Sequence, residues 1–199
     1  MAESDFPLIE VLGSERQRIE DELLSAVQTS DEHLTELAQH LIVAGGKRLR
    51  PVLTMVAGAL GDRTISQDVV RGGVSCELVH LGSLYHDDVM DESPTRRGVE
   101  TVNAKWGNLQ AILAGDFLLA RASEIAASLG TEVAGLLAKT IAWLCEGQIE
   151  ELRTTYDPTR TNESYFASIR GKTASLYGTS AQVGGIVTRL DRPVIDALT

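Results

Sequence analysis

Apolar residues recur at helical spacing through most of this chain, and short stretches of Gly, Pro or Asp interrupt them. Spacings of three and four place such side chains on one face of a helix, so the pattern predicts amphipathic helices. No series of alternating apolar and polar residues indicates strands. The predicted helical ranges are 14–42 (one or two helices), 51–60, 68–92, 109–129, 132–153 and 164–187, and residues 194–199 begin another.

The composition agrees with helices packing on helices. Aromatic residues make up only 5% of the 199 residues, which favours a helical fold over a sandwich or barrel. No internal repeat and no low-complexity tract marks a second unit. The sequence therefore predicts an all-α fold, with residues 1–199 in a single helical domain.

Charge and hydropathy exclude several classes of protein. A net charge of -10 argues against a nucleic-acid partner, which usually meets a basic face. No apolar run reaches the roughly 18 residues that a transmembrane segment requires. The N-terminus lacks the basic start of a secretion signal, and Cys76 and Cys145 stand far apart in apolar runs. We expect two core thiols, no disulfide and a cytoplasmic protein.

An acidic turn ends the helix predicted over 68–92. It holds Asp87, Asp88 and Asp91, of which Asp87 and Asp91 share one face. Like charges at this spacing destabilise a helix by roughly 0.2–0.5 kcal/mol per pair, and the helix dipole disfavours anions at a C-terminus. A hard cation would relieve both penalties, and Mg²⁺ is the usual choice where phosphate is the partner. A solvated helix end would show the same pattern.

Basic residues gather after this turn and at one helix start. Arg96 and Arg97 follow the turn, and "GGKRLRP" places Lys47, Arg48 and Arg50 where the next helix dipole disfavours cations. The two glycines let a ligand approach the backbone closely, and free helix N–H groups with basic side chains make a phosphate site. One metal cluster and two anion clusters together indicate one or two diphosphates. As an alternative, the arginines after the turn form surface salt bridges with it.

Three further residues have two interpretations each. His80 lies seven residues before Asp87 on the same helical stripe, where it is either a packed histidine or a donor to phosphate. "GKTAS" is not a P-loop, because Phe166 stands where the motif requires glycine and no strand precedes it. Lys172 and Thr173 in this segment are either a cation and a hydroxyl aimed at a ligand or ordinary surface residues.

Four segments resemble, in order and spacing, those of trans-polyprenyl diphosphate synthases. They are "GGKRLRP", "HLGSLYHDDVMDESPTRRG", "AILAGDFLLARA" and "GKTASLYG", and the resemblance runs from about residue 45 to residue 185. It implies an isoprenoid-synthase-type helical bundle around a deep central cavity. It also implies head-to-tail addition of isopentenyl diphosphate to an allylic diphosphate.

The resemblance implies a role for each matching residue. Asp87 and Asp91 would coordinate Mg²⁺ that bridges to the allylic diphosphate, with Asp88 in support. Arg96 would contact the same diphosphate, and Lys172 and Thr173 would lie over it as it leaves. The isopentenyl diphosphate would be held by Lys47, Arg50, His80 and Arg97. The implied catalytic set is Asp87, Asp88, Asp91, Arg96 and Lys172.

Product length and assembly follow from the same resemblance. Gly82 and Ser83, about one turn before the first aspartate, would line the pocket into which the product grows. Both are small, so we expect a polyprenyl diphosphate longer than fifteen carbons. The resemblance also implies a homodimer, with much of its interface on the central helices. Without the missing C-terminal helices, we expect the apolar faces of the helices over 109–129 and 132–153 to be partly exposed, which favours association.

The family's second aspartate-rich motif has no counterpart here. After Asp88 the sequence has no further Asp-Asp pair, and Asp191 and Asp196 lack the required spacing. We therefore expect about the N-terminal two-thirds of a synthase domain, with C-terminal helices missing and no activity by itself.

Three alternative functions stay open. The chain could be a catalytically silent subunit or fragment that binds a partner synthase. A class I terpene cyclase is disfavoured, because it has no second diphosphate substrate for the "GGKRLRP" cluster to hold. An HD-type metal phosphohydrolase, suggested by His86 and Asp87, would need more histidine ligands at helical spacing.

Overall fold

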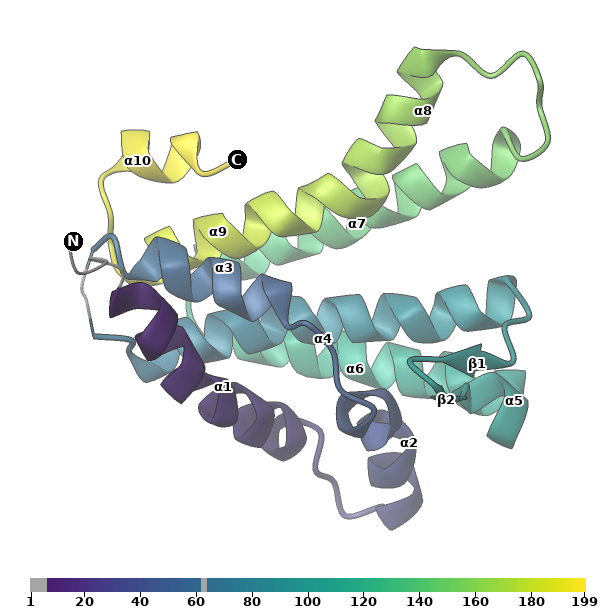
Figure 1. Ribbon diagram of the computed structural model, residues 1–199, viewed down its shortest axis with the longest axis horizontal. Coiled ribbons are helices and arrows are strands. Elements are labelled where there is room, and N and C mark those ends of the chain that lie inside the picture. The colour runs from purple at the N-terminus through teal and green to yellow at the C-terminus, as the bar shows by residue number, and fades with distance from the viewer. Residues whose placement is uncertain (1–6, 62–63) are drawn as a thin grey trace, which may run out of the picture.

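The structure, a computed structural model, describes residues 7–61 and 64–199 and is mostly helical there, which confirms the all-α prediction (Figure 1). The helices are α1 (Pro7–Ala26), α2 (Glu32–Val43), α3 (Leu49–Gly58), α4 (Gln67–Met90), α5 (Val102–Trp106), α6 (Asn108–Ser128), α7 (Thr131–Arg153), α8 (Asn162–Ile169), α9 (Ser175–Val187) and α10 (Arg192–Ala197). A π-helix, η1 (Arg170–Ala174), joins α8 to α9. A hairpin of β1 (Thr95–Arg96) and antiparallel β2 (Val99–Glu100) follows α4.

Side-chain caps mark where several helices begin. Asp31 accepts two backbone N–H groups at 3.0 Å at the start of α2. Ser66 caps α4 and Thr161 caps α8 in the same way. These oxygens satisfy N–H groups that a helix start leaves without an intrahelical partner. Gly130, at φ +118°, separates α6 from α7 at the break that the sequence predicts.

Helix α4 is the centre of the core. It packs against α1, α3, α6 and α9, and buried side chains occur along nearly its whole length. In Figure 1, α4 and α6 run side by side, while the α8 end of the α7–α9 pair diverges from them. The last turn of α4 therefore carries Asp87 and Asp88 on an element that packing holds in place.

A close contact between α3 and α9 positions the basic segment. A Cβ at Gly184 of α9 would collide with the Thr54 carbonyl oxygen and lie 3.0 Å from the Gly58 nitrogen. The Thr54 hydroxyl donates to the Ser180 carbonyl at 2.8 Å across the same contact. Because α3 is held here, Arg50 in its first turn lies buried rather than in solvent.

Gly184→Ala is expected to lower the free energy of unfolding by about 1–3 kcal/mol, because the added Cβ overpacks this contact. Gly135→Ala on α7 is the matched control, since a Cβ there meets nothing within 4 Å. Its helix propensity predicts a gain of roughly 0.5–1 kcal/mol. Urea denaturation followed by circular dichroism measures both variants, and equal losses at the two glycines would contradict the role given to this contact.

Some predictions for the helices are wrong. The chain over 164–187 is helical as predicted, with the π-helix η1 between α8 and α9, but the hairpin after α4 was not predicted. Helix α7, predicted as a core helix, leaves Trp143 37% exposed and buries few residues: Val133, Leu137, Thr140 and Gly147. Cys145 is therefore exposed rather than a core thiol, whereas Cys76 is buried, and neither forms a disulfide. Within the described ranges, no helix combines the length and hydropathy of a membrane span.

Candidate functional site

The acidic pair lies at the end of α4. Asp87 is half-buried, and Asp91 is exposed just after the helix, where its N–H donates to the Asp87 carbonyl at 2.8 Å. Burial raises the pKa of Asp87; the charge of Lys172 on η1 opposes this rise, and the charge of Asp91 adds to it. The pair is thus a site of unfavourable negative charge, as the sequence predicts.

Asp88 has a different environment from its neighbours. It is 1% exposed, and its Oδ1 accepts the Nε–H of Arg96 at 2.6 Å. Burial raises the pKa of Asp88 and the Arg96 guanidinium opposes this rise. The Asp88 carbonyl also accepts the N–H of Ser93 at 2.9 Å. Asp88 therefore anchors the turn that follows α4, and it fixes the position of Arg96.

The donor set fits Mg²⁺ held jointly with a phosphate. Within residues 7–61 and 64–199, no group of three or more His, Cys, Asp or Glu side chains could hold a metal alone. Asp87 and Asp91 supply carboxylate oxygens on one helix end, and no thiolate is near them in sequence. Mg²⁺ typically takes one or two carboxylates, several waters and substrate phosphates, so two carboxylates suffice for this ion.

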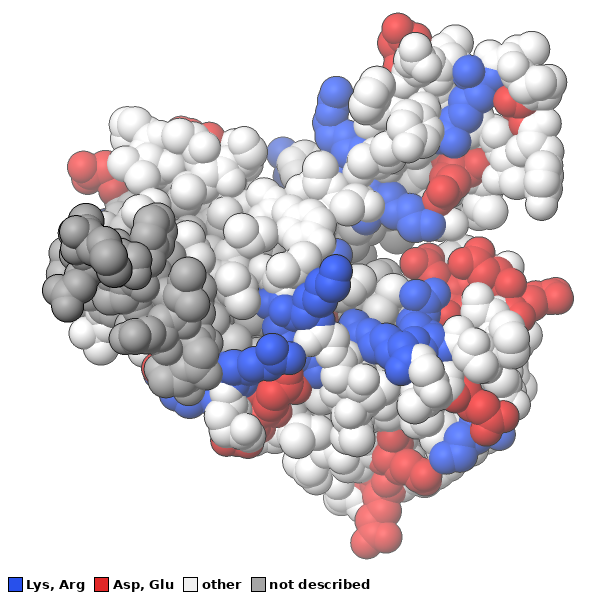
Figure 2. All heavy atoms as spheres, in the orientation of Figure 1, with Lys and Arg blue, Asp and Glu red and all other residues white. Residues whose placement is uncertain are grey.

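Basic residues on the loop before α3 and in the first turn of α3 lie near basic residues of the turn that follows α4. Arg50 is 9% exposed and lies 4.8 Å from the centroid of the Tyr177 ring, and its Nε has no hydrogen-bond partner. Arg97, at φ +53°, donates from Nη1 to the carbonyls of Leu41 (2.9 Å) and Gly45. Lys47 is exposed on the loop before α3. Figure 2 shows basic side chains around a hollow beside the end of α4, with acidic side chains along its right-hand edge.

Gly46 permits Arg97 to lie against this loop. A Cβ at Gly46 would lie 3.0 Å from the guanidinium carbon of Arg97, tighter than ordinary contact. The absence of a side chain at Gly46 thus gives the Arg97 guanidinium room against this loop. The sequence analysis assigned the two glycines to close ligand approach, and this neighbour was not foreseen.

His80 is held neutral in the basic pocket. Burial lowers its pKa to about 3, and the charges of Arg50, Arg97, Arg96 and Arg48 add to this effect. A neutral imidazole still has one N–H to donate. His80 can therefore hydrogen-bond a phosphate without bringing a further positive charge.

Lys172 lies on the π-helix and bonds across to α7. Its Nζ donates to Oε2 of Glu151 at 2.7 Å. A Cβ at Gly147 would collide with the backbone nitrogen of Lys172. A Cβ at Gly171 would lie 2.8 Å from the Trp143 carbonyl oxygen. The two glycines thus let η1 approach α7 closely enough for this pair to form. Thr173, next to Lys172, is exposed.

The two residues predicted to limit product length differ in environment. Gly82 is buried against α6, where a Cβ would lie 3.0 Å from the Gly115 carbonyl and 3.2 Å from Leu119. Ser83 is half-buried, and its hydroxyl donates to the His80 carbonyl at 2.8 Å. Ser83 is therefore the position at which a larger side chain finds room.

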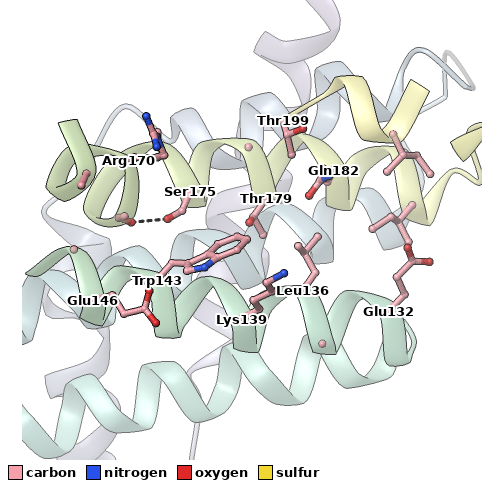
Figure 3. A pocket seen from close by; sticks show the side chains of 18 of the residues that line it. Glu132, Leu136, Lys139, Trp143, Glu146, Arg170, Ser175, Thr179, Gln182 and Thr199 are labelled. Atoms are coloured by element: carbon pink, nitrogen blue, oxygen red, sulfur yellow. Dashed lines mark hydrogen bonds between the residues drawn. The ribbon is translucent and has the colours of Figure 1, made fainter. Parts of the chain in front are cut away.

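A large cavity lies elsewhere in the part of the chain that the structure describes. It has a volume of about 990 Å³ and opens between α7 and the segment from α8 to α10. Figure 3 shows Trp143, Lys139 and Glu146 of α7 facing Thr179 and Gln182 of α9 across it. None of the residues predicted to bind metal or diphosphate lines this cavity. The residues of the predicted site lie instead at the end of α4, in the turn after it, on the loop before α3, in α3 and on η1.

Sequence reasoning missed Glu77, named Arg48 in the basic cluster without a partner, and proposed one chemistry that the geometry does not support. Arg48 and Glu77 are both buried and paired at 3.2 Å. The signal for Glu77 was a single acid inside the apolar run "SCELVHL". His86 turns to α6, with Nε2 at 3.3 Å from the Ile112 carbonyl and 3.4 Å from Asp116, which disfavours an HD-type site with Asp87.

Comparisons with known proteins extend this description. A family model described as Polyprenyl synthetase matches residues 31–199. Nonaprenyl diphosphate synthase of Mycobacterium tuberculosis is 41% identical over 169 residues, covering 85% of this chain and 50% of that protein. A decaprenyl diphosphate synthase structure from Rhodobacter capsulatus aligns with a TM-score of 0.90 and 33% identity, covering 96% of this chain and 59% of that one.

A third relative carries ligands. The structure of geranylgeranyl pyrophosphate synthase from Corynebacterium glutamicum, complexed with calcium and isoprenyl diphosphate, aligns with a TM-score of 0.83 and 35% identity. The alignment covers 100% of this chain and 60% of that one. The chain spans about half the length of the curated relatives that it matches.

Proposed function

Because the chain belongs to the polyprenyl synthetase family, we propose that it is a Mg²⁺-dependent prenyltransferase that condenses isopentenyl diphosphate with an allylic diphosphate. The product is a polyprenyl diphosphate longer than fifteen carbons. Residues 1–199 form one helical domain of this synthase in the proposal.

One observation carries the proposal: the acidic end of α4 faces Lys172, and a basic pocket lies about two turns earlier along the same helix. The charge of Lys172 acts on Asp87, and the charges of Arg50 and Arg97 act on His80. The arrangement provides one place for a metal-bound diphosphate and another for a second diphosphate. The related Corynebacterium glutamicum structure, complexed with calcium and isoprenyl diphosphate, supports ligands of this chemistry.

The acidic end binds the allylic substrate in this proposal. Asp87 and Asp91 would hold Mg²⁺, which neutralises charge that develops on the leaving diphosphate. Arg96, fixed by Asp88, contacts the same diphosphate from the turn after α4. Lys172 gives up its hydrogen bond to Glu151 and donates to a diphosphate oxygen instead, and the Thr173 hydroxyl donates to the same diphosphate.

The basic pocket binds isopentenyl diphosphate. Arg50, Arg97 and exposed Lys47 supply positive charge, and neutral His80 supplies a hydrogen-bond donor. Holding both substrates on one helix gives the reacting carbons a fixed separation, which is a large part of catalysis in a bimolecular reaction. The double bond attacks the allylic cation and a proton is then lost, so the protein needs no nucleophilic side chain.

Ser83→Phe is expected to shorten the main product by one or more isoprene units, because the ring would occupy space beside α4 into which the chain grows. Ser128→Phe on α6 is the matched control, because this serine is exposed. Like Ser83, it donates its hydroxyl to the carbonyl three residues earlier in its helix, here Ile125 at 2.6 Å. Chromatography of the products made by a full-length synthase that contains this chain measures both variants, because we do not expect the 199-residue polypeptide to elongate a primer by itself. A parent product of fifteen carbons, or an unchanged product from Ser83→Phe, would overturn the assignment of this position.

Assembly and location are further parts of the proposal. The homodimer uses α6 and α7, which expose Leu109 (79%), Leu113 (64%) and Leu152 (51%). Exposed apolar side chains gathered on one surface are typical of protein interfaces. A cytoplasmic location agrees with the two free thiols. Light scattering tests the dimer, and a monodisperse monomer would contradict it.

The activity is tested with radiolabelled isopentenyl diphosphate and an allylic primer, with and without Mg²⁺. We expect the 199-residue polypeptide to bind both diphosphates but not to elongate the primer by itself, because the second aspartate-rich motif expected of the family has no counterpart in this sequence. Sustained elongation by the polypeptide would contradict that expectation while supporting the reaction. Binding of neither diphosphate would overturn the proposed function and favour a silent, partner-binding subunit.

A further inference from the structure

A single buried acid lies behind the basic pocket. Glu77, in the middle of α4, is 1% exposed, and Arg48 and Arg50 beside it are 2% and 9% exposed. A carboxylate in the interior is costly unless positive charge and hydrogen bonds compensate it. One of the Glu77 oxygens, Oε2, has no hydrogen-bond partner. The free-energy cost of burying this carboxylate indicates that Glu77 has a role beyond packing.

Arg48 connects Glu77 to the loop that carries Lys47. Its guanidinium donates to Oε1 of Glu77 at 3.2 Å and to the Ile42 carbonyl at 2.8 Å. It also makes two bonds to Glu20 of α1, at 2.8 and 2.9 Å. Arg48 adopts φ +50° to do so. The loop before α3 is therefore held against the end of α2 and the middle of α4.

Glu77 also acts on the arginines that the proposed function places on isopentenyl diphosphate. Burial lowers the pKa of Arg50 and of Arg97, and the Glu77 charge opposes that effect on each of them. Arg48 and Arg50, in turn, repel Arg97. The Glu77 charge thus acts on all three of these guanidinium groups.

We propose that Glu77 is a positioning residue: it keeps Arg48, Arg50 and Arg97 gathered in the basic pocket before isopentenyl diphosphate arrives. This inference rests on the proposed function of that pocket. Without the Glu77 charge the guanidinium groups repel one another and turn toward solvent. Binding then has to bring them back together, which weakens affinity.

The sign of the effect separates positioning from bulk electrostatics. If Glu77 were only a nearby negative charge, its removal would make the pocket more positive and tighten diphosphate binding. If Glu77 gathers the arginines, its removal weakens binding. The effect should also be confined to isopentenyl diphosphate. The proposed allylic site, with Asp87 and Asp91, lies at the C-terminal end of α4, whereas Glu77 lies in the middle of that helix.

The test is calorimetry of Glu77→Gln with isopentenyl diphosphate and with a thio analogue of an allylic diphosphate in Mg²⁺. We expect the dissociation constant for isopentenyl diphosphate to rise about tenfold and that for the allylic analogue to stay within about twofold of the parent. Glu20→Gln is the matched control, since it removes the other acid from Arg48 without acting on Arg50 or Arg97. It should leave both affinities within about twofold.

Glu77→Asp decides the question if Glu77→Gln does not fold. It keeps the charge but withdraws it by one methylene, so we expect a selective loss of about threefold for isopentenyl diphosphate. Unchanged or tighter isopentenyl diphosphate binding by a folded variant would overturn this inference alone. Equal losses for both diphosphates, or for Glu20→Gln, would show a structural role and also overturn it. A parent that binds neither ligand would overturn the proposed function together with this inference.

Discussion

Replacing Asp87 with alanine is expected to abolish Mg²⁺-dependent binding of an allylic diphosphate analogue, with affinity falling by at least about 100-fold. The half-buried Asp87 carboxylate is one of the two metal ligands proposed at the acidic end of α4. Without it, one of the two proposed ligands is lost and the pocket keeps too little negative charge for the ion. Calorimetry with and without Mg²⁺ measures the loss.

Asp21→Ala is the matched control for this experiment. Asp21 is exposed on α1, where it accepts a hydrogen bond from Gln17 at 2.8 Å, and it lies outside the site. Its removal should leave binding unchanged. If Asp87→Ala binds the analogue in Mg²⁺ as tightly as the parent does, the metal site proposed on α4 is wrong.

The same residue links function to stability. The pKa of Asp87 is raised in the folded protein, chiefly by burial, so ionisation costs stability as pH rises from the ordinary carboxyl pKa through the raised one. Asp87→Asn should therefore be more stable than the parent near neutral pH, by roughly 0.5 kcal/mol from the relieved repulsion of Asp91. The difference should vanish in acid, where both states of the parent are protonated. Denaturation at several pH values tests this sign.

Replacing Arg50 with methionine is expected to weaken isopentenyl diphosphate binding by at least about 100-fold. The guanidinium is buried beside Tyr177, and its Nε–H has no partner within the protein. A charge-assisted donor held in place without competing bonds is well prepared to bind phosphate. Methionine fills a similar volume but offers no donor and no charge.

Stability and a control variant separate this loss from misfolding. Burial disfavours the charged form of Arg50, so methionine should leave the free energy of unfolding unchanged or raise it. Arg71→Met is the matched control, because Arg71 lies on α4 but pairs with Glu22 at 3.7 Å, away from the pocket. If both variants bind isopentenyl diphosphate like the parent, Arg50 has no place in that site.

Local patterns predicted most of the helices because helix starts and stops depend on neighbouring residues. Asp31 and Ser66 cap α2 and α4, and Gly130 separates α6 from α7. The period of apolar residues did not predict how deeply each helix is buried. Helix α7 has an apolar sequence, yet Trp143 and Cys145 are exposed because the helices around it cover only part of its surface.

The candidate site was predicted residue by residue but not as a network. Asp87, Asp91 and Arg50 could be selected because their charges stand at helix ends where the dipole disfavours them. Glu77 and Arg48 could not be paired in advance. Their contact joins residues 29 apart in the chain, and it forms only because α3 packs against α4.

The sequence by itself determined the helical class, most helix boundaries to within a few residues and the charged residues that carry the proposed chemistry, although α1 begins at Pro7 rather than at residue 14. These properties depend on spacing along the chain and on the chemistry of single side chains. The tertiary structure decided which charges meet: Lys172 with Glu151, Arg96 with Asp88, and Arg48 with Glu77. The tertiary structure also decided which charged side chains are buried away from water. Burial depends on helices that are distant in the sequence, and close packing at Gly147 and Gly184 brings such helices into contact.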